Sequence, residues 1–165
     1  MADKTLDTLF HETLKDVYYA EGKIASALGK MARAAQNSDL RAALEAHEEE
    51  TQAHVDRLTQ VFDLMGEKPS TKTCAAIEGI IHEGKEIMDE FKGSPALDAG
   101  LLAAAQAAEH YEISRYGALK SWARQLGMDE AAALLDRNLK EEMATDKALT
   151  DLAESVINAA AQKAA

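Results

Sequence analysis

The stretch LLAAAQAAEHYEISRYGAL (residues 101–119) carries the pattern that decides the fold. Its apolar side chains recur every three or four residues, which is the period of an amphipathic helix. Two acidic residues, Glu109 and Glu112, lie on the same apolar stripe. A helix that buries this stripe against other helices therefore takes two carboxylates into the interior with it.

The composition extends the helical pattern to the whole chain of 165 residues. Alanine supplies 33 residues and proline only 2, a mixture that favours helices and excludes an all-β or collagen-like protein. The length suits a single domain over residues 1–165. Glycine, proline and N-capping residues divide it into four long helices and one short helix, which we expect over residues 3–36, 38–66, 73–91, 96–126 and 129–160, followed by a frayed tail.

The connections between these helices predict how the helices are arranged. Ser38 or Asp39 is expected to cap the second helix, and Gly66 and Gly127 to end the second and fourth. The two tight turns make two antiparallel hairpins, and the long crossover between them holds the short helix. An all-α, ferritin-like four-helix bundle has this plan. A weak internal repeat supports it, because a shift of 91 residues aligns Glu21 with Glu112.

Charge and cysteine content exclude several classes of protein. The chain has 18 basic and 29 acidic residues, a formal charge of −11, so a nucleic-acid partner is not expected. No apolar run approaches the roughly 20 residues of a membrane-spanning helix. The first residues do not resemble a secretory signal, so we expect a cytoplasmic protein. Cys74 is the single cysteine, which excludes a disulfide framework and a cysteine-rich metal site.

Each long helix carries at least one acid on its apolar stripe. Counted from the hairpin turns at 1.5 Å per residue, four of these acids fall at roughly one level of the bundle. Further acids and a histidine form the adjacent layer. The candidate metal ligands are Glu21, His47, Glu50, His54, Glu109, Glu112, Glu142 and Asp146.

Buried carboxylates must hold protons, pair with bases or coordinate metal, because desolvation and mutual repulsion oppose their ionisation. Oxygen ligands with a minority of imidazole suit two iron or manganese ions. The usual Glu-x-x-His pair is altered here, since Glu50 and His54 are four residues apart and Asp146 replaces the second histidine. Whether His47 or His54 binds metal stays open, with His54 also interpretable as an exposed or packing side chain. Tyr116 is either a core residue or a hydrogen-bond donor to a bound oxygen species.

Several segments together resemble the bacterial YciF/YciE family: HEEET (47–51), CAAIEG (74–79), AAEHYEI (107–113), YG (116–117) and EEMATD (141–146). The resemblance runs from Leu6 to about Val156. It implies a ferritin-like bundle, dimeric and related to rubrerythrin, from a family associated with bacterial stress responses. It also implies that His47, Glu50, Glu109, Glu112 and Glu142 belong to the family motifs and that His54 does not.

Two functions compete on this basis. The first is a di-metal protein that reduces peroxide or oxygen and oxidises Fe(II). It would need an external electron donor, because one cysteine cannot form a Cys₄ iron centre. The alternative is a non-catalytic, dimeric helical stress protein whose polar core is structural. Iron storage with DNA protection is disfavoured, since the chain has no basic tail.

Overall fold

The computed structural model describes residues 4–163, and every regular element in that range is helical. The all-α prediction is therefore confirmed. The elements are α1 (Leu6–Ala34), α2 (Ser38–Leu64), α3 (Ala75–Glu90), α4 (Leu97–Gln125), α5 (Asp129–Leu152), a π-helical segment (Ala153–Ile157) and α6 (Asn158–Lys163).

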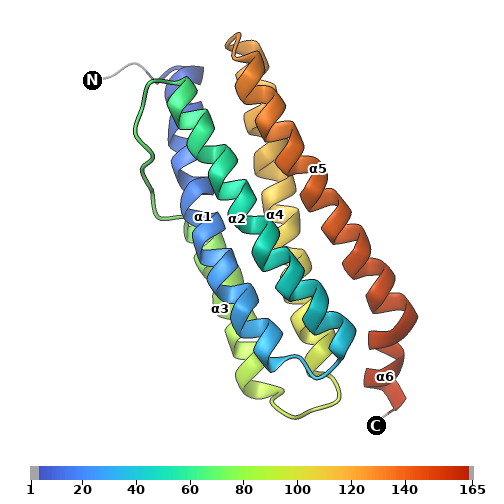
Figure 1. The fold of residues 1–165 in the computed structure, drawn as a ribbon. Helices are drawn as coiled ribbons and strands as arrows, with labels where there is room; N and C mark the ends of the chain where they lie inside the picture. Colours follow the sequence, from blue (N-terminus) through green and yellow to red (C-terminus); the bar gives the residue numbers. More distant parts are fainter. Residues whose placement is uncertain (1–3, 164–165) are drawn as a thin grey trace.

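Four long helices pack side by side (Figure 1). α1 packs against α2 and α4 packs against α5 as the two hairpins, while α2–α5 and α1–α4 contacts join the hairpins together. The short helix α3 lies outside this group, against α1 and α4. None of the helices between residues 4 and 163 is long and apolar enough to cross a membrane.

Three helices are followed by a glycine whose backbone conformation favours that residue. Gly66, Gly93 and Gly127 have φ between 72° and 73°, a left-handed conformation that costs glycine little. The predictions for Gly66 and Gly127 are confirmed. The N-cap prediction is wrong by one residue: Asn37, not Ser38 or Asp39, caps α2, because its side-chain oxygen accepts the backbone N–H groups of Asp39 and Leu40.

The last predicted helix also differs from the structure. α5 ends at Leu152, and the π-helical segment separates it from α6. Residues 161–163 remain helical, so a frayed tail is wrong for them, and residues 164–165 lie outside the described part of the chain. The short crossover helix begins at Ala75, after Cys74 whose sulfur accepts the backbone N–H of Ile77.

The apolar core forms two clusters along the long helices. One contains Phe10 and Val17 of α1, and the other contains Ile24 and Leu28 of the same helix. Glu21 lies between them in sequence and is fully buried. The polar residues described next therefore occupy the middle of the bundle, with apolar packing on both sides.

Candidate metal centre

Six ionisable side chains from four helices are buried in the middle of the bundle. The four carboxyl groups have no exposed surface, and the two histidines are at most 4% exposed. They are Glu21 of α1, His47 and His54 of α2, Glu109 and Glu112 of α4, and Glu142 of α5.

Helical spacing explains why these residues face inward. On α4, Glu109, Glu112 and Tyr116 follow one another at three- and four-residue steps, so one face carries all three. On α2, His47 and His54 are seven residues apart, which is two helical turns along one face. Leucines on the same faces, Leu44 and Leu119 among them, are buried and anchor these faces in the core.

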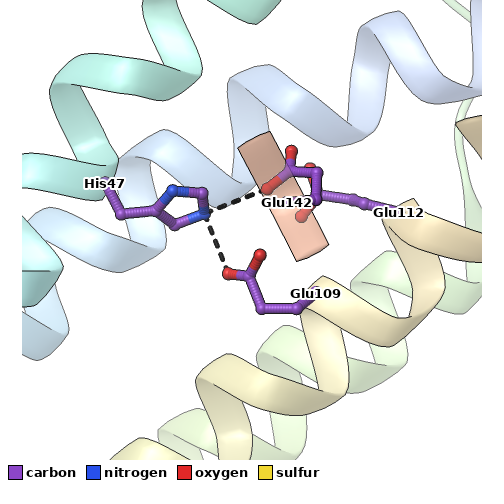
Figure 2. A group of neighbouring side chains, drawn as sticks. All are labelled: His47, Glu109, Glu112 and Glu142. Carbon is purple, nitrogen blue, oxygen red and sulfur yellow. Dashed lines mark ion pairs between the residues drawn. The ribbon is translucent and has the colours of Figure 1, made fainter. Parts of the chain in front are cut away.

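The first group of possible ligands is His47, Glu109, Glu112 and Glu142 (Figure 2). One nitrogen or oxygen atom from each residue lies within 4.8 Å of the others. The His47 Nε2 atom is 2.8 Å from Glu109 Oε1 and 3.6 Å from Glu142 Oε2. Figure 2 shows the three carboxyl groups and the imidazole pointing toward one common region.

The second group is Glu21, His54 and Glu142, again with one atom each within 4.8 Å. The His54 Nδ1 atom is 2.8 Å from Glu142 Oε1 and 3.7 Å from Glu21 Oε1. Glu142 belongs to both groups. Its Oε1 lies nearer His54 and its Oε2 nearer His47, so one carboxylate lies between the two histidines.

Apart from the imidazole–carboxylate contacts given above, most polar atoms of these groups have no hydrogen-bond partner. This holds for both oxygens of Glu109, Glu112 and Glu142, and for the two His47 nitrogens. Buried polar atoms in proteins are nearly always paired, and an unpaired one costs about 1–3 kcal/mol. The set of oxygen and imidazole donors, aimed at one another and otherwise unpaired, fits hard divalent cations such as iron or manganese.

The groups also perturb one another's protonation. Burial lowers the pKa of both histidines, but the contacts with carboxylates outweigh it: Glu109 and Glu142 raise the pKa of His47 to about 9, and Glu142 and Glu21 raise that of His54 to about 10. Burial and the neighbouring carboxylates raise the pKa of Glu112 well above its usual value. Without metal, the cluster therefore retains protons at neutral pH.

A hydrogen-bonded network supports the second group from outside. The Tyr116 hydroxyl donates to Glu21, and Asn138 Nδ2 donates to the Tyr116 oxygen at 3.1 Å. Arg57 donates to Asn138 Oδ1 at 2.6 Å and also binds Glu141. Tyr116 is fully buried, which confirms its interpretation as a core residue, whereas donation to a bound oxygen species stays a prediction.

His54 is linked to the same network through its second nitrogen. Glu141 Oε2 lies 3.1 Å from His54 Nε2, on the side of the ring away from Glu142. Arg57 and Arg137 bind Glu141, and these bonds lower its pKa although partial burial acts in the opposite direction. An ionised Glu141 accepts the Nε2 proton, which leaves Nδ1 facing the buried carboxylates as a potential ligand atom.

Glu50 and Asp146 do not join the buried groups. The Glu50 side chain is 37% exposed, with His47 Nδ1 at 3.7 Å and the Thr145 hydroxyl donating to it. Thr51 occupies the inward position of α2 instead, because one residue turns the helix by about 100°. Asp146 accepts a hydrogen bond from Gln106 and lies 3.2 Å from His110, on the flank of α5. Glu50 forms a more exposed third group with His54 and Glu141.

His54 requires the opposite correction. Interpreting it as an exposed side chain is wrong, since it is fully buried and contacts both Glu21 and Glu142. Sequence reasoning also missed Arg57, Asn138 and Glu141. Spacing gave a signal for Asn138, which lies four residues before Glu142 on the same inward face of α5 and is 1% exposed.

Comparison with known proteins places this chain among close relatives. The family model of DUF892, a domain of unknown function, matches residues 5–162 of this chain. Protein YciF of Escherichia coli K12 is 43% identical over 163 residues, covering 98% of each chain. The crystal structure of that E. coli stress protein superposes with a TM-score of 0.90, covering 94% of this chain and 99% of the other.

Two further solved structures extend the comparison. YcfI of Rhodopseudomonas palustris, described as "a putative structural protein", is 46% identical with a TM-score of 0.87, covering 89% of this chain and 94% of that one. A protein of Xanthomonas campestris pv. campestris is 22% identical with a TM-score of 0.75 over 98% of both chains, and it shares the fold.

Proposed function

The chain belongs to the DUF892 family, and on that premise we propose that it is a ferritin-like, di-metal carboxylate protein. The two hairpins and their crossover would form the four-helix bundle, and the six buried side chains would bind two iron or manganese ions. The E. coli relative is a stress protein. A role for this chain in stress, through reduction of peroxide or oxygen, is part of the proposal.

The observation that carries the proposal is the position of Glu142. Its two oxygens are divided between His47 and His54, so the first and second groups share one carboxylate. Paired metal sites in helical bundles are built from glutamates and histidines on facing helices. A shared carboxylate is the feature that distinguishes such a pair from two unrelated acidic clusters.

The residues have separable roles in this proposal. His47, Glu109, Glu112 and Glu142 would hold one ion, and Glu21, His54 and Glu142 the other. Reduction of hydrogen peroxide to two waters takes two electrons and two protons, and two Fe(II) ions held by these residues would supply the two electrons. An external donor would return the electrons, since Cys74 alone cannot form a second iron centre.

The surrounding residues would orient the ligands. The Tyr116 hydroxyl, itself bound by the Asn138 amide, fixes one oxygen of Glu21, and Glu141 fixes the ring of His54. Complete burial of the four carboxyl groups excludes bulk water. In such a site, electrostatic interactions with a cation are stronger than at the surface.

Anaerobic titration of chelator-treated protein with Fe(II) or Mn(II) tests this assignment. We expect two ions per chain for the wild type. Glu142→Gln should weaken the binding of both ions at least tenfold, since both groups use this carboxylate. Glu109→Gln should weaken the binding of one ion and leave that of the other unchanged. Glu50→Gln is the matched control and should retain both ions. Failure to bind two ions, or equal behaviour of the Glu142 and Glu50 variants, would refute the proposal.

A second candidate is a metal-free helical protein with a structural polar core. One observation favours it: the raised pKa values of His47 and His54 allow each imidazolium to pair with a buried carboxylate. The description of the R. palustris relative as a structural protein agrees with this candidate. Under this candidate, added metal leaves the thermal unfolding temperature unchanged. Under the di-metal proposal, it raises that temperature by mass action.

The remaining expectations from the sequence are part of the same proposal. We propose a homodimer in the cytoplasm, with no nucleic-acid partner. Size-exclusion chromatography with light scattering tests the dimer directly.

A further inference from the structure

A cavity of about 290 Å³ lies between α1, α3 and α4, separate from the candidate metal centre. Its walls are mainly aliphatic, and they include Ile24, Leu28, Ile81, Met88, Ala104 and Ala105. None of the lining residues belongs to the buried cluster, although Ala105 and Ala108 each lie one helical turn from Glu109 and Glu112 on α4. The volume is at the small end of the range for pockets that bind small molecules.

The packing of α3 explains why the space is left. α3 approaches α4 closely, because a Cβ atom on Gly84 would lie 3.4 Å from the Ala104 Cβ and one on Gly100 would lie 2.6 Å from Ile87. On the α1 side, the small side chains of Ser26 and Ala27 line the cavity. They are too short to fill the gap between α1 and α3.

Lysines are placed at defined levels along this cavity. At one level Lys23 Nζ lies 3.3 Å from Glu78 Oε1, and the Tyr19 hydroxyl donates to the same carboxylate. α1 and α3 run in the same direction (Figure 1). Seven residues further along both helices, about 10 Å away, Lys30 and Lys85 therefore fall at a common level, and both line the cavity.

The two levels differ in charge balance. Lys23 and Glu78 neutralise each other, whereas neither Lys30 nor Lys85 has an ion pair or side-chain hydrogen bond with any residue in the range 4–163. Both of these lysines are solvent-exposed, and they bring two positive charges to one end of an apolar slot. An anion placed between them would gain from both charges.

We propose that this cavity binds a fatty carboxylate. The carboxylate would lie between Lys30 and Lys85, and the alkyl chain would lie along Ile24, Leu28 and Ile81 toward the Lys23–Glu78 pair. Burial of the chain supplies the affinity, and the two lysines select an anionic head group. The ligand is thus a free anionic amphiphile, recognised by both of its ends.

Calorimetric titration with dodecanoate, below its micelle concentration, tests the inference. We expect one dodecanoate per chain, and binding at least tenfold weaker for dodecanol or acetate, each of which has one of the two recognised ends. The double variant Lys30→Glu, Lys85→Glu should bind dodecanoate at least tenfold more weakly than the wild type. The variant Lys4→Glu, Lys68→Glu makes the same charge change at exposed positions and should stay within twofold of the wild type.

Filling the cavity provides a test that does not depend on charge. Ala27→Leu and Ser26→Leu each place an aliphatic side chain toward the space on α1, and leucine is a good helix former. A variant that keeps its helical circular dichroism should lose binding of both dodecanoate and dodecanol.

Several outcomes would overturn the proposal. They are no dodecanoate binding by the wild type, binding unaffected by either leucine substitution, or equal binding of dodecanol that the charge reversal leaves unchanged. A leucine variant that converts a dimer to a monomer would show that a second copy occupies the cavity. Tight binding of the wild type to phosphatidylglycerol vesicles would assign the surface to a membrane.

Discussion

Replacing Glu112 by glutamine should affect the metal-free and metal-bound protein in opposite directions. The side chain is fully buried, and one of its oxygens lies within 4.8 Å of atoms of Glu109 and Glu142. At an effective dielectric constant of 20, two unit charges at 4.8 Å repel by about 3.5 kcal/mol. Glutamine keeps the shape of the side chain and removes this charge at every pH.

The sign follows from the raised pKa of Glu112, whose main cause is burial, followed by the charges of Glu142, Glu21 and Glu109. A carboxyl group with a raised pKa in the folded state contributes stability that is complete below its unfolded value of about 4.5 and is lost as the pH rises. We therefore expect the metal-free wild type and Glu112→Gln to unfold with similar free energies at pH 5. At pH 9 the variant should be more stable by at least about 2 kcal/mol, a conservative share of one pairwise repulsion.

Urea unfolding in the presence of a chelator, followed by circular dichroism at pH 5, 7 and 9, measures this difference. Glu49→Gln is the control, because this neighbouring glutamate is exposed and should give a small and pH-independent change. The same Glu112→Gln protein should bind one Fe(II) or Mn(II) at least tenfold more weakly than the wild type. If the variant were less stable than the wild type at pH 9, or lost stability with pH as steeply, the account of the cluster as crowded, protonated carboxyl groups would be wrong.

Three further predictions concern single residues. Asp98→Ala should lower the free energy of unfolding by about 3 kcal/mol, because the buried carboxylate accepts the backbone N–H groups of Gln36 and Asn37 at 2.8 and 2.7 Å. Urea titration measures this change, and a value under about 1 kcal/mol would contradict the role of Asp98. Gly127→Ala should lower the free energy of unfolding by about 1 kcal/mol, because the residue has φ +73°. Gly79→Ala, on the exposed face of α3, should raise it by about 0.5–1 kcal/mol. Equal melting temperatures for the two variants would contradict this difference in backbone conformation. Tyr116→Phe should destabilise the metal-free protein by about 1–3 kcal/mol through the lost bond to Glu21, and an unchanged urea midpoint would show that this bond contributes nothing.

Much of the fold could be predicted from local sequence. Apolar periodicity and the glycines at positions 66 and 127 gave the helices and their ends, because both act within a few residues. Errors occurred where one residue decides the outcome. The α2 N-cap moved to Asn37 because its side chain, rather than that of Ser38, reaches the free N–H groups. The π-helical segment at Ala153–Ile157 left no such local signal.

The candidate site divides in the same way. Glu21, Glu109, Glu112 and Glu142 could be assigned to the interior, since well-marked apolar stripes surround them. On α2 the stripe is marked mainly by Leu44 and Leu58, fourteen residues apart, with alanines and charged residues between them. A helix turns by about 100° per residue, so a small error in placing that face exchanges Glu50 for Thr51 and brings His54 inward.

The sequence alone therefore determined a helical chain of two hairpins that carries acids on its buried stripes, because helical periodicity is a local property. The tertiary structure decided which side chains meet. The division of Glu142 between His47 and His54, and the contact of Arg57 with Asn138 and Glu141, depend on how each helix is rotated and shifted against its neighbours. That arrangement is set by the packing of the whole apolar core, which no single stretch of sequence contains.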